Sequence, residues 1–127
     1  MASHSSYLRD AHALAAGEAA KDRLANGKGH SFHAAIVVTR AATVWATNVT
    51  TVDHRAFGHH AEMRAIQKVS PASLKGATVY VARSMSGRWG DSRPCSSCER
   101  KLRNMGVAMV LYTTKGGIEA RVTYRKV

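Results

Sequence analysis

The chain has 127 residues, of which 45% are hydrophobic, and this size and composition fit one globular domain over residues 1–127. The sequence shows neither an apolar run of membrane-spanning length nor a secretion signal, so we expect a cytoplasmic protein without a membrane partner. Its net charge of +11 favours phosphate-bearing partners, although an aromatic content of only 6% weakens the case for single-strand binding by base stacking. A basic, solvated surface without such a partner is the alternative.

Hydrophobic periodicity and turn residues predict eight elements in the order α-β-β-α-β-α-β-β. In chain order, they are a helix over 6–25, strands over 33–38 and 43–48, a helix over 59–69, a strand over 77–82, a helix over 95–105, and strands over 107–112 and 118–124. We therefore expect a three-layer α/β/α fold, with a mixed five-stranded sheet flanked by helices. The turn at 115–117 is too short for a crossover helix, so the last two strands should form an antiparallel hairpin.

Two separated motifs carry the residues best suited to chemistry. One is His60-Ala61-Glu62, and the other is Pro94-Cys95-Ser96-Ser97-Cys98, which contains both cysteines of the chain. One imidazole and two thiolates are good ligands for Zn²⁺ and leave a fourth position for water. Glu62 lies two residues after His60 and can reach that water instead of the metal. Each motif also opens a predicted helix, so the sequence indicates a catalytic zinc site where two helices begin.

Each motif has a simpler interpretation when it is taken alone. A Cys-x-x-Cys pair is more often half of a structural zinc site, or a redox pair, than part of a catalytic centre. A structural site needs a fourth ligand, and His59 is the residue that would supply it. A structural site has no use for Glu62, however, and the two motifs together favour catalysis.

The two motifs and the order of elements around them resemble the cytidine deaminase-like superfamily over roughly residues 33–124. This resemblance implies that Zn²⁺ is the cofactor, that His60, Cys95 and Cys98 are its ligands, and that Glu62 shuttles protons. It also implies substrate contacts from Asn48, at the end of the second strand, and from the backbone N–H of Ala61. Members of the superfamily often assemble, so we expect a homo-oligomer.

Other residues near the two motifs are candidates for substrate contact. Residues 84–93 read as a loop that is longer than in compact members of the superfamily, and its Arg88 and Trp89 could form a lid or a phosphate clamp. An oligomer contact or a plain surface insertion is the alternative. Phe57 precedes the first motif and could stack on a base, although a packing role is the simpler interpretation.

The antiparallel ending resembles the free cytidine deaminases, the blasticidin-type deaminases and some bacterial toxin deaminases. Free cytidine deaminases, however, usually have a third cysteine where this chain has His60. We therefore expect a small-molecule substrate, a cytosine nucleoside or nucleotide that is hydrolysed to the uracil product and ammonia. Cytosine within single-stranded DNA or RNA is the alternative substrate, and a zinc-stabilised binding domain without activity is a third hypothesis.

Overall fold

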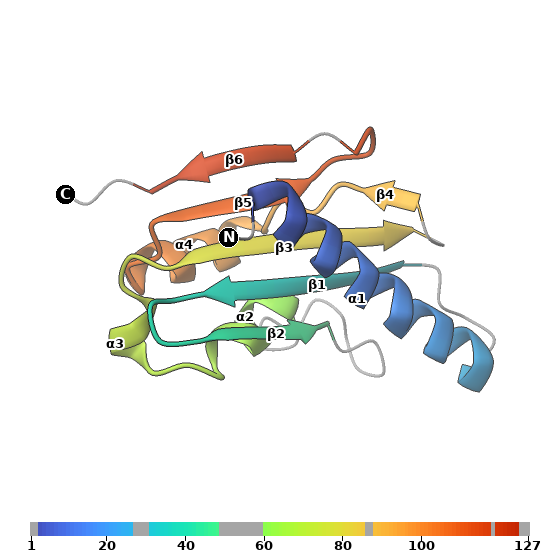
Figure 1. Ribbon diagram of the computed structural model, residues 1–127, viewed down its shortest axis with the longest axis horizontal. Helices are drawn as coiled ribbons and strands as arrows, with labels where there is room; N and C mark the ends of the chain where they lie inside the picture. The colour runs from blue at the N-terminus through green and yellow to red at the C-terminus, as the bar shows by residue number, and fades with distance from the viewer. Residues whose placement is uncertain (1–2, 27–30, 49–59, 86–87, 118, 125–127) are drawn as a thin grey trace.

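A mixed sheet forms the middle layer of the molecule (Figure 1). The computed structural model describes residues 3–26, 31–48, 60–85, 88–117 and 119–124. Its main strands follow the order β2-β1-β3-β5-β6. They are β1 (Ser31–Val38), β2 (Thr43–Thr47), β3 (Thr78–Met85), β5 (Met109–Thr113) and β6 (Glu119–Thr123). Only the β3–β5 pair among these neighbours is parallel, and β5 and β6 form the expected antiparallel hairpin.

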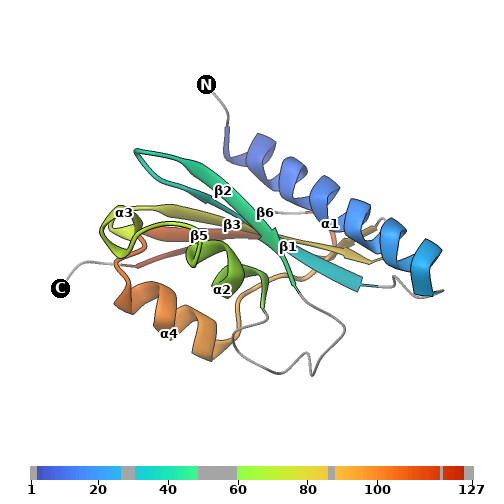
Figure 2. The ribbon, with the colours of Figure 1, turned by 90° about the horizontal axis from the view of Figure 1, so that it is seen from below.

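One long helix, α1 (His4–Asn26), covers one face of the sheet (Figure 2). Its buried side is made of small residues, and Ala11 and Ala15 are fully buried. Alanine side chains let the helix axis come close to the sheet, where Tyr7 stacks on Tyr80 of β3 with ring centroids 4.7 Å apart. Ala11, Ala15 and Ala19 thus recur along one side of the helix, at the spacing of a helix that covers a sheet.

Three shorter helices lie on the opposite face of the sheet: α2 (Ala61–Ile66), α3 (Pro71–Leu74) and α4 (Ser96–Asn104) (Figure 2). Alternate strand residues point to each face, as the pleat of a β-strand requires. Ala35, Val37 and Val79 pack under α2 and α4, whereas Ala34, Ile36 and Tyr80 pack under α1. The three-layer α/β/α architecture is therefore confirmed.

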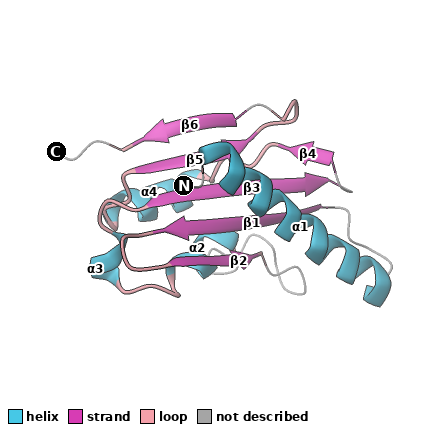
Figure 3. Cartoon of the chain, viewed as in Figure 1, coloured by secondary structure: helices cyan, strands magenta, loops and turns pink. Residues whose placement is uncertain are grey.

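The segment predicted as a loop, residues 84–93, is partly β-structure, and this prediction was wrong. Strand β3 continues to Met85, and β4 (Arg88–Gly90) folds back against it as a sixth strand (Figure 3). Three residues are too few to show an alternation of apolar and polar side chains, so pairing with β3 is what defines β4.

The helix predicted over 59–69 was also too long. Helix α2 ends at Ile66, and Pro71 is the first residue of α3. Proline fits the first turn of a helix because its missing N–H would have no partner there. Across the described residues, no helix combines the length and the hydropathy needed to cross a bilayer.

Candidate metal centre

His60, Cys95 and Cys98 meet where α2 and α4 begin. His60 caps the N-terminus of α2 and Cys95 caps that of α4, both with extended backbone, so each motif does open a helix. The potential ligand atoms of the three residues lie within 4.8 Å of one another. His60 Nδ1 is 3.2 Å from the Cys98 sulfur and 3.8 Å from the Cys95 sulfur.

These distances fit one tetrahedral zinc ion. Zinc bonds of about 2.3 Å to sulfur and about 2.0 Å to nitrogen place tetrahedral ligands about 3.5 Å apart, between the two observed separations. Cys98 is buried and Cys95 is exposed, so the cluster has an outer side towards solvent. Burial raises the pKa of the Cys98 thiol, and a bound cation would offset that effect by stabilising the thiolate. The donor set of the cluster therefore suits zinc.

Glu62 lies in the first turn of α2, and its side chain is only 6% exposed. Burial raises the pKa of this carboxyl, while a hydrogen bond from its own backbone and the nearby His60 act in the opposite direction. The cluster thus has a buried carboxyl in the first turn of the helix that follows His60.

Asn48 follows the end of β2 and is joined to His33 of β1 by two hydrogen bonds. The His33 backbone N–H donates to Asn48 Oδ1 at 2.7 Å, and the Asn48 N–H donates to the His33 carbonyl at 3.2 Å. Arg64 of α2 donates to the carbonyl of Thr47, one residue earlier. These bonds fix the end of β2 to both β1 and α2, so Asn48 has a defined position at this end of the sheet.

Sequence reasoning gave no role to His33 or to the Arg93–Glu99 pair. His33 Nδ1 lies 2.9 Å from Ser92 Oγ, in the segment that leads to Cys95. The pKa of His33 is lowered to about 4, chiefly by burial and further by the positive charge of Arg83. Arg93 Nε donates to Glu99 Oε1 at 3.1 Å, and these two residues lie on either side of Cys95 and Cys98 in the sequence. A histidine at the start of a buried strand was the one signal available from the sequence.

The structure separates Trp89 from the cluster. Trp89 stacks on His12 of α1, with centroids 4.1 Å apart, and the Arg88 carbonyl accepts a hydrogen bond from His12 Nε2 at 3.1 Å. Because α1 covers the opposite face of the sheet, Trp89 has a packing partner on that side. Phe57 and His59 lie outside the described residues, so their predicted roles stay predictions.

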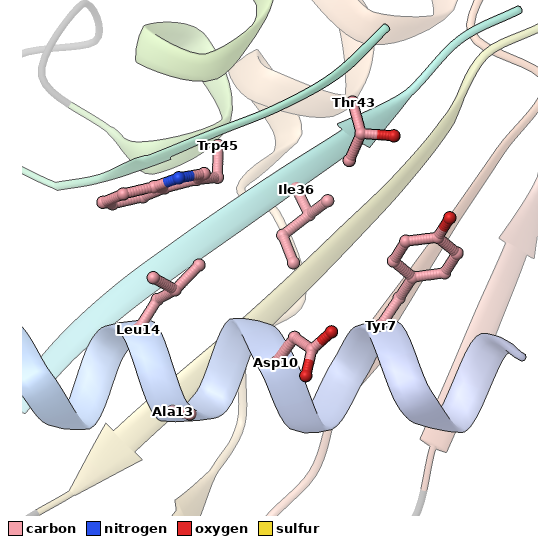
Figure 4. Close-up of a pocket in the computed structure, with 7 residues that line it drawn as sticks. All are labelled: Tyr7, Asp10, Ala13, Leu14, Ile36, Thr43 and Trp45. Carbon is pink, nitrogen blue, oxygen red and sulfur yellow. The ribbon is translucent and has the colours of Figure 1, made fainter. Parts of the chain in front are cut away.

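A groove of about 440 Å³ lies on the α1 face of the sheet, away from the cluster (Figure 4). It runs between α1 and the β1–β2 hairpin, and Trp45, which is 45% exposed, forms one wall. Its only charged lining residue is Asp10 of α1. The groove is therefore mostly apolar and holds none of the three clustered ligands.

The chain matches a known protein family. The model described as "Cytidine and deoxycytidylate deaminase zinc-binding region" matches residues 3–114, which include both motifs and all helices of the structure. No curated protein matches the sequence.

Proposed function

Because the chain belongs to the cytidine and deoxycytidylate deaminase zinc-binding family, we propose that it hydrolyses the amino group of cytosine in a free (deoxy)cytidine nucleoside or nucleotide. The observation that carries this proposal is the buried Glu62 beside a His/Cys/Cys cluster. A purely structural zinc site would gain nothing from burying a carboxyl there, because burial of an unpaired carboxylate is costly.

In this proposal, His60, Cys95 and Cys98 hold Zn²⁺, the cofactor of the family. Zinc, when bound, lowers the pKa of water from about 16 to about 7 and so makes a nucleophile available at neutral pH. Three protein ligands leave the fourth position open, as catalytic zinc sites require. The exposed side of the cluster at Cys95 is the side from which water and substrate approach.

Glu62 moves the protons of the reaction. It takes one proton from the attacking water and gives it to the ring nitrogen N3. It then takes the second proton from the new hydroxyl group on C4 and gives it to the amino group, which leaves as ammonia. The new bond is C4–O and the broken bond is C4–N, so cytosine and water give uracil and ammonia. Proton transfer by one positioned carboxyl contributes about 10²- to 10⁴-fold to a rate.

Asn48 and Ala61 orient the substrate in this proposal. Asn48 Oδ1 already accepts from His33, which leaves the amide N–H₂ to donate to the sugar or the base. Ala61 is the first residue of α2, and a backbone N–H at that position has no acceptor within its own helix. Both groups therefore offer donors at the edge of the cluster.

Cytosine in single-stranded DNA or RNA is the second candidate substrate, and the distribution of charge favours it. Helix α1 has three basic and three acidic residues in its sequence. The segments 60–75 and 93–105, which carry the cluster, have seven basic residues and only two acids, Glu62 and Glu99. A positive field on the face of the cluster attracts a phosphate backbone as well as a nucleotide phosphate.

A substrate panel tests the proposal. Ammonia and uracil formation would be measured with cytidine, deoxycytidine, their monophosphates and a cytosine-containing oligonucleotide at matched salt. We expect turnover of a small substrate by the wild-type protein and loss of at least about 10²-fold in Glu62→Gln, with one zinc per chain retained. Activity on the oligonucleotide alone would transfer the proposal to the polymer, and full activity of Glu62→Gln would overturn the mechanism.

A further inference from the structure

His33 is a partly buried histidine that the proposed mechanism does not use. It lies in β1 on the side that Ala35 and Val37 share, which faces α2 and α4 and hence the metal centre. Its Nδ1 is within hydrogen-bond distance of Ser92, 59 residues away in the sequence. Buried polar groups need hydrogen-bond partners, and both the backbone and the ring of His33 have them.

The backbone of His33 sets the position of Asn48. Two hydrogen bonds join these residues. The His33 N–H donates to Asn48 Oδ1, and the Asn48 N–H donates to the His33 carbonyl. The carboxamide is thus fixed by β1 and not by its own strand alone. A shift of His33 would move the donor that Asn48 offers to a substrate.

The ring of His33 contacts the segment that leads into the metal ligands. Ser92 is fully enclosed, and its N–H donates to the carbonyl of Thr113 in β5 at 2.9 Å. Thr113 Oγ1 in turn donates to the Gly90 carbonyl at 2.8 Å and accepts from the Arg83 N–H at 3.2 Å. These bonds hold residues 90–92 against the ends of β3 and β5, and the hydrogen bond between the His33 ring and Ser92 joins the same segment to β1.

The surroundings of His33 keep its ring neutral. Burial removes water from the imidazole, and the Arg83 guanidinium adds positive charge nearby, so the pKa of His33 lies well below the ordinary value. A neutral ring has one nitrogen that donates and one that accepts, and Ser92 Oγ can serve either role. The His33–Ser92 bond is therefore stable across the neutral pH range.

We infer that His33 is a positioning residue that sets the distance between Asn48 and the Cys95 end of the metal centre. His33 bonds to Asn48 through its backbone and to Ser92, in the segment before Pro94, through its ring. Partners behind a metal site typically change metal affinity or activity by about 10- to 100-fold when they are removed. This inference rests on the proposed function for its substrate, but its effect on the metal does not.

The test is a double-mutant cycle with His33→Ala, Ser92→Ala and the combination. The zinc dissociation constant, by chelator competition, and kcat and KM for the best substrate would be measured for each variant. We expect each single change to weaken zinc binding and to lower kcat/KM by about tenfold or more. The double variant should be no worse than the poorer single variant, because both changes remove the same bond.

Two further variants sharpen the cycle. His33→Asn can place an amide atom close to the position of Nδ1, so we expect it to recover most of the lost zinc affinity and kcat/KM. His12→Ala is the control, since His12 contacts Trp89 and Arg88 on the other face and should leave both quantities unchanged. If His33→Ala fails to fold, Ser92→Ala and His33→Asn still carry the comparison.

The outcomes separate this inference from the proposed function. Zinc dissociation constants within twofold of wild type in both single variants would overturn the positioning role, whatever the activity. The role would also be overturned if the losses of zinc affinity in the two single variants multiplied in the double variant. It would likewise be overturned if His33→Asn recovered no zinc affinity while Ser92→Ala kept the zinc affinity of wild type. A wild-type protein that deaminates no cytosine substrate would refute the proposed function, and the zinc measurements would still decide the role of His33.

Discussion

On one face of the sheet, a single helix of 23 residues lies across β1 and β3, while on the other face two helices of six and nine residues begin at the metal centre. The long helix buries a stripe of alanines and leucines, and none of the three clustered ligands belongs to it. Each of the two short helices has a ligand at its N-cap and an acidic side chain in its first turn.

The difference shows how one sheet serves two purposes. A helix that covers a sheet needs length and a uniform apolar side, since its stability comes from packing. A helix that positions functional groups needs only a fixed N-terminus, because the N-cap residue and the first turn carry those groups. Changes on the metal face should therefore alter zinc and activity, and changes on the α1 face should alter stability alone.

The largest expected effect is the loss of a metal ligand. Cys98→Ser should lower zinc affinity by several orders of magnitude and remove activity, because the buried sulfur belongs to one of the three proposed ligands among the described residues. Zinc content would be measured by metal analysis after dialysis. Full zinc occupancy in this variant would show that the proposed ligand set is wrong, and Ser97→Ala, at a neighbouring exposed position, is the matched control.

Shortening a core side chain under α1 should have a large effect on stability and none on zinc content or activity. Leu111 is fully buried in the cluster that α1 covers, and Leu111→Ala should cost about 3 kcal/mol in the free energy of unfolding. Denaturant unfolding would measure this loss. We expect zinc content and kcat per folded molecule to stay at wild-type values, and a fall in either would mean that the two faces are coupled.

The pH dependence of stability should report on His33. The folded-state pKa of His33 is about 4, against an ordinary value of 6.5, so below pH 6.5 the unfolded chain binds a proton that the folded protein excludes. Stability is therefore lost as the pH falls, by roughly 2 kcal/mol from this group between pH 7 and pH 5.

Denaturant unfolding of wild type and His33→Asn at both pH values would measure this contribution as a difference. Zinc ligands and other titrating groups are common to the two proteins and cancel. Equal pH dependence in the two proteins would mean that His33 is not held neutral in the folded state.

The smallest expected effect is at Trp89. Its stack on His12 is worth about 1 kcal/mol, so Trp89→Leu should reduce the free energy of unfolding by about that amount and leave KM unchanged. A KM raised several-fold would instead support the substrate contact predicted from the 84–93 segment, and would bring the β3–β4 hairpin into the active site.

Much of the fold could be predicted because its signals are local. The alanine spacing of α1, the apolar runs of β1 and β5, and the short turn before β6 each specify one element. Glycine at 106, with a φ of 88°, ends α4 in the conformation that favours this residue. Elements without a local signal were missed, such as β4, which only its pairing with β3 defines.

The candidate site was predictable in its residues but not in its connections. His60 and Cys95 were expected at helix starts, and both are N-caps. The link between His33 and Ser92 joins strands and loops that are distant in the chain, and no spacing rule connects them. Trp89 was expected near the metal because of its place in the sequence, but the register of β4 turns it towards α1.

The sequence by itself determined which residues can hold zinc and carry a proton, and in which order the helices and strands follow. Residue type and local periodicity decide those properties. Only the tertiary structure decided that two motifs about 35 residues apart meet within 4.8 Å, that Trp89 packs away from them, and that His33 joins Asn48 to the segment before Cys95. Those relations depend on strand order and register, which form through contacts between distant parts of the chain.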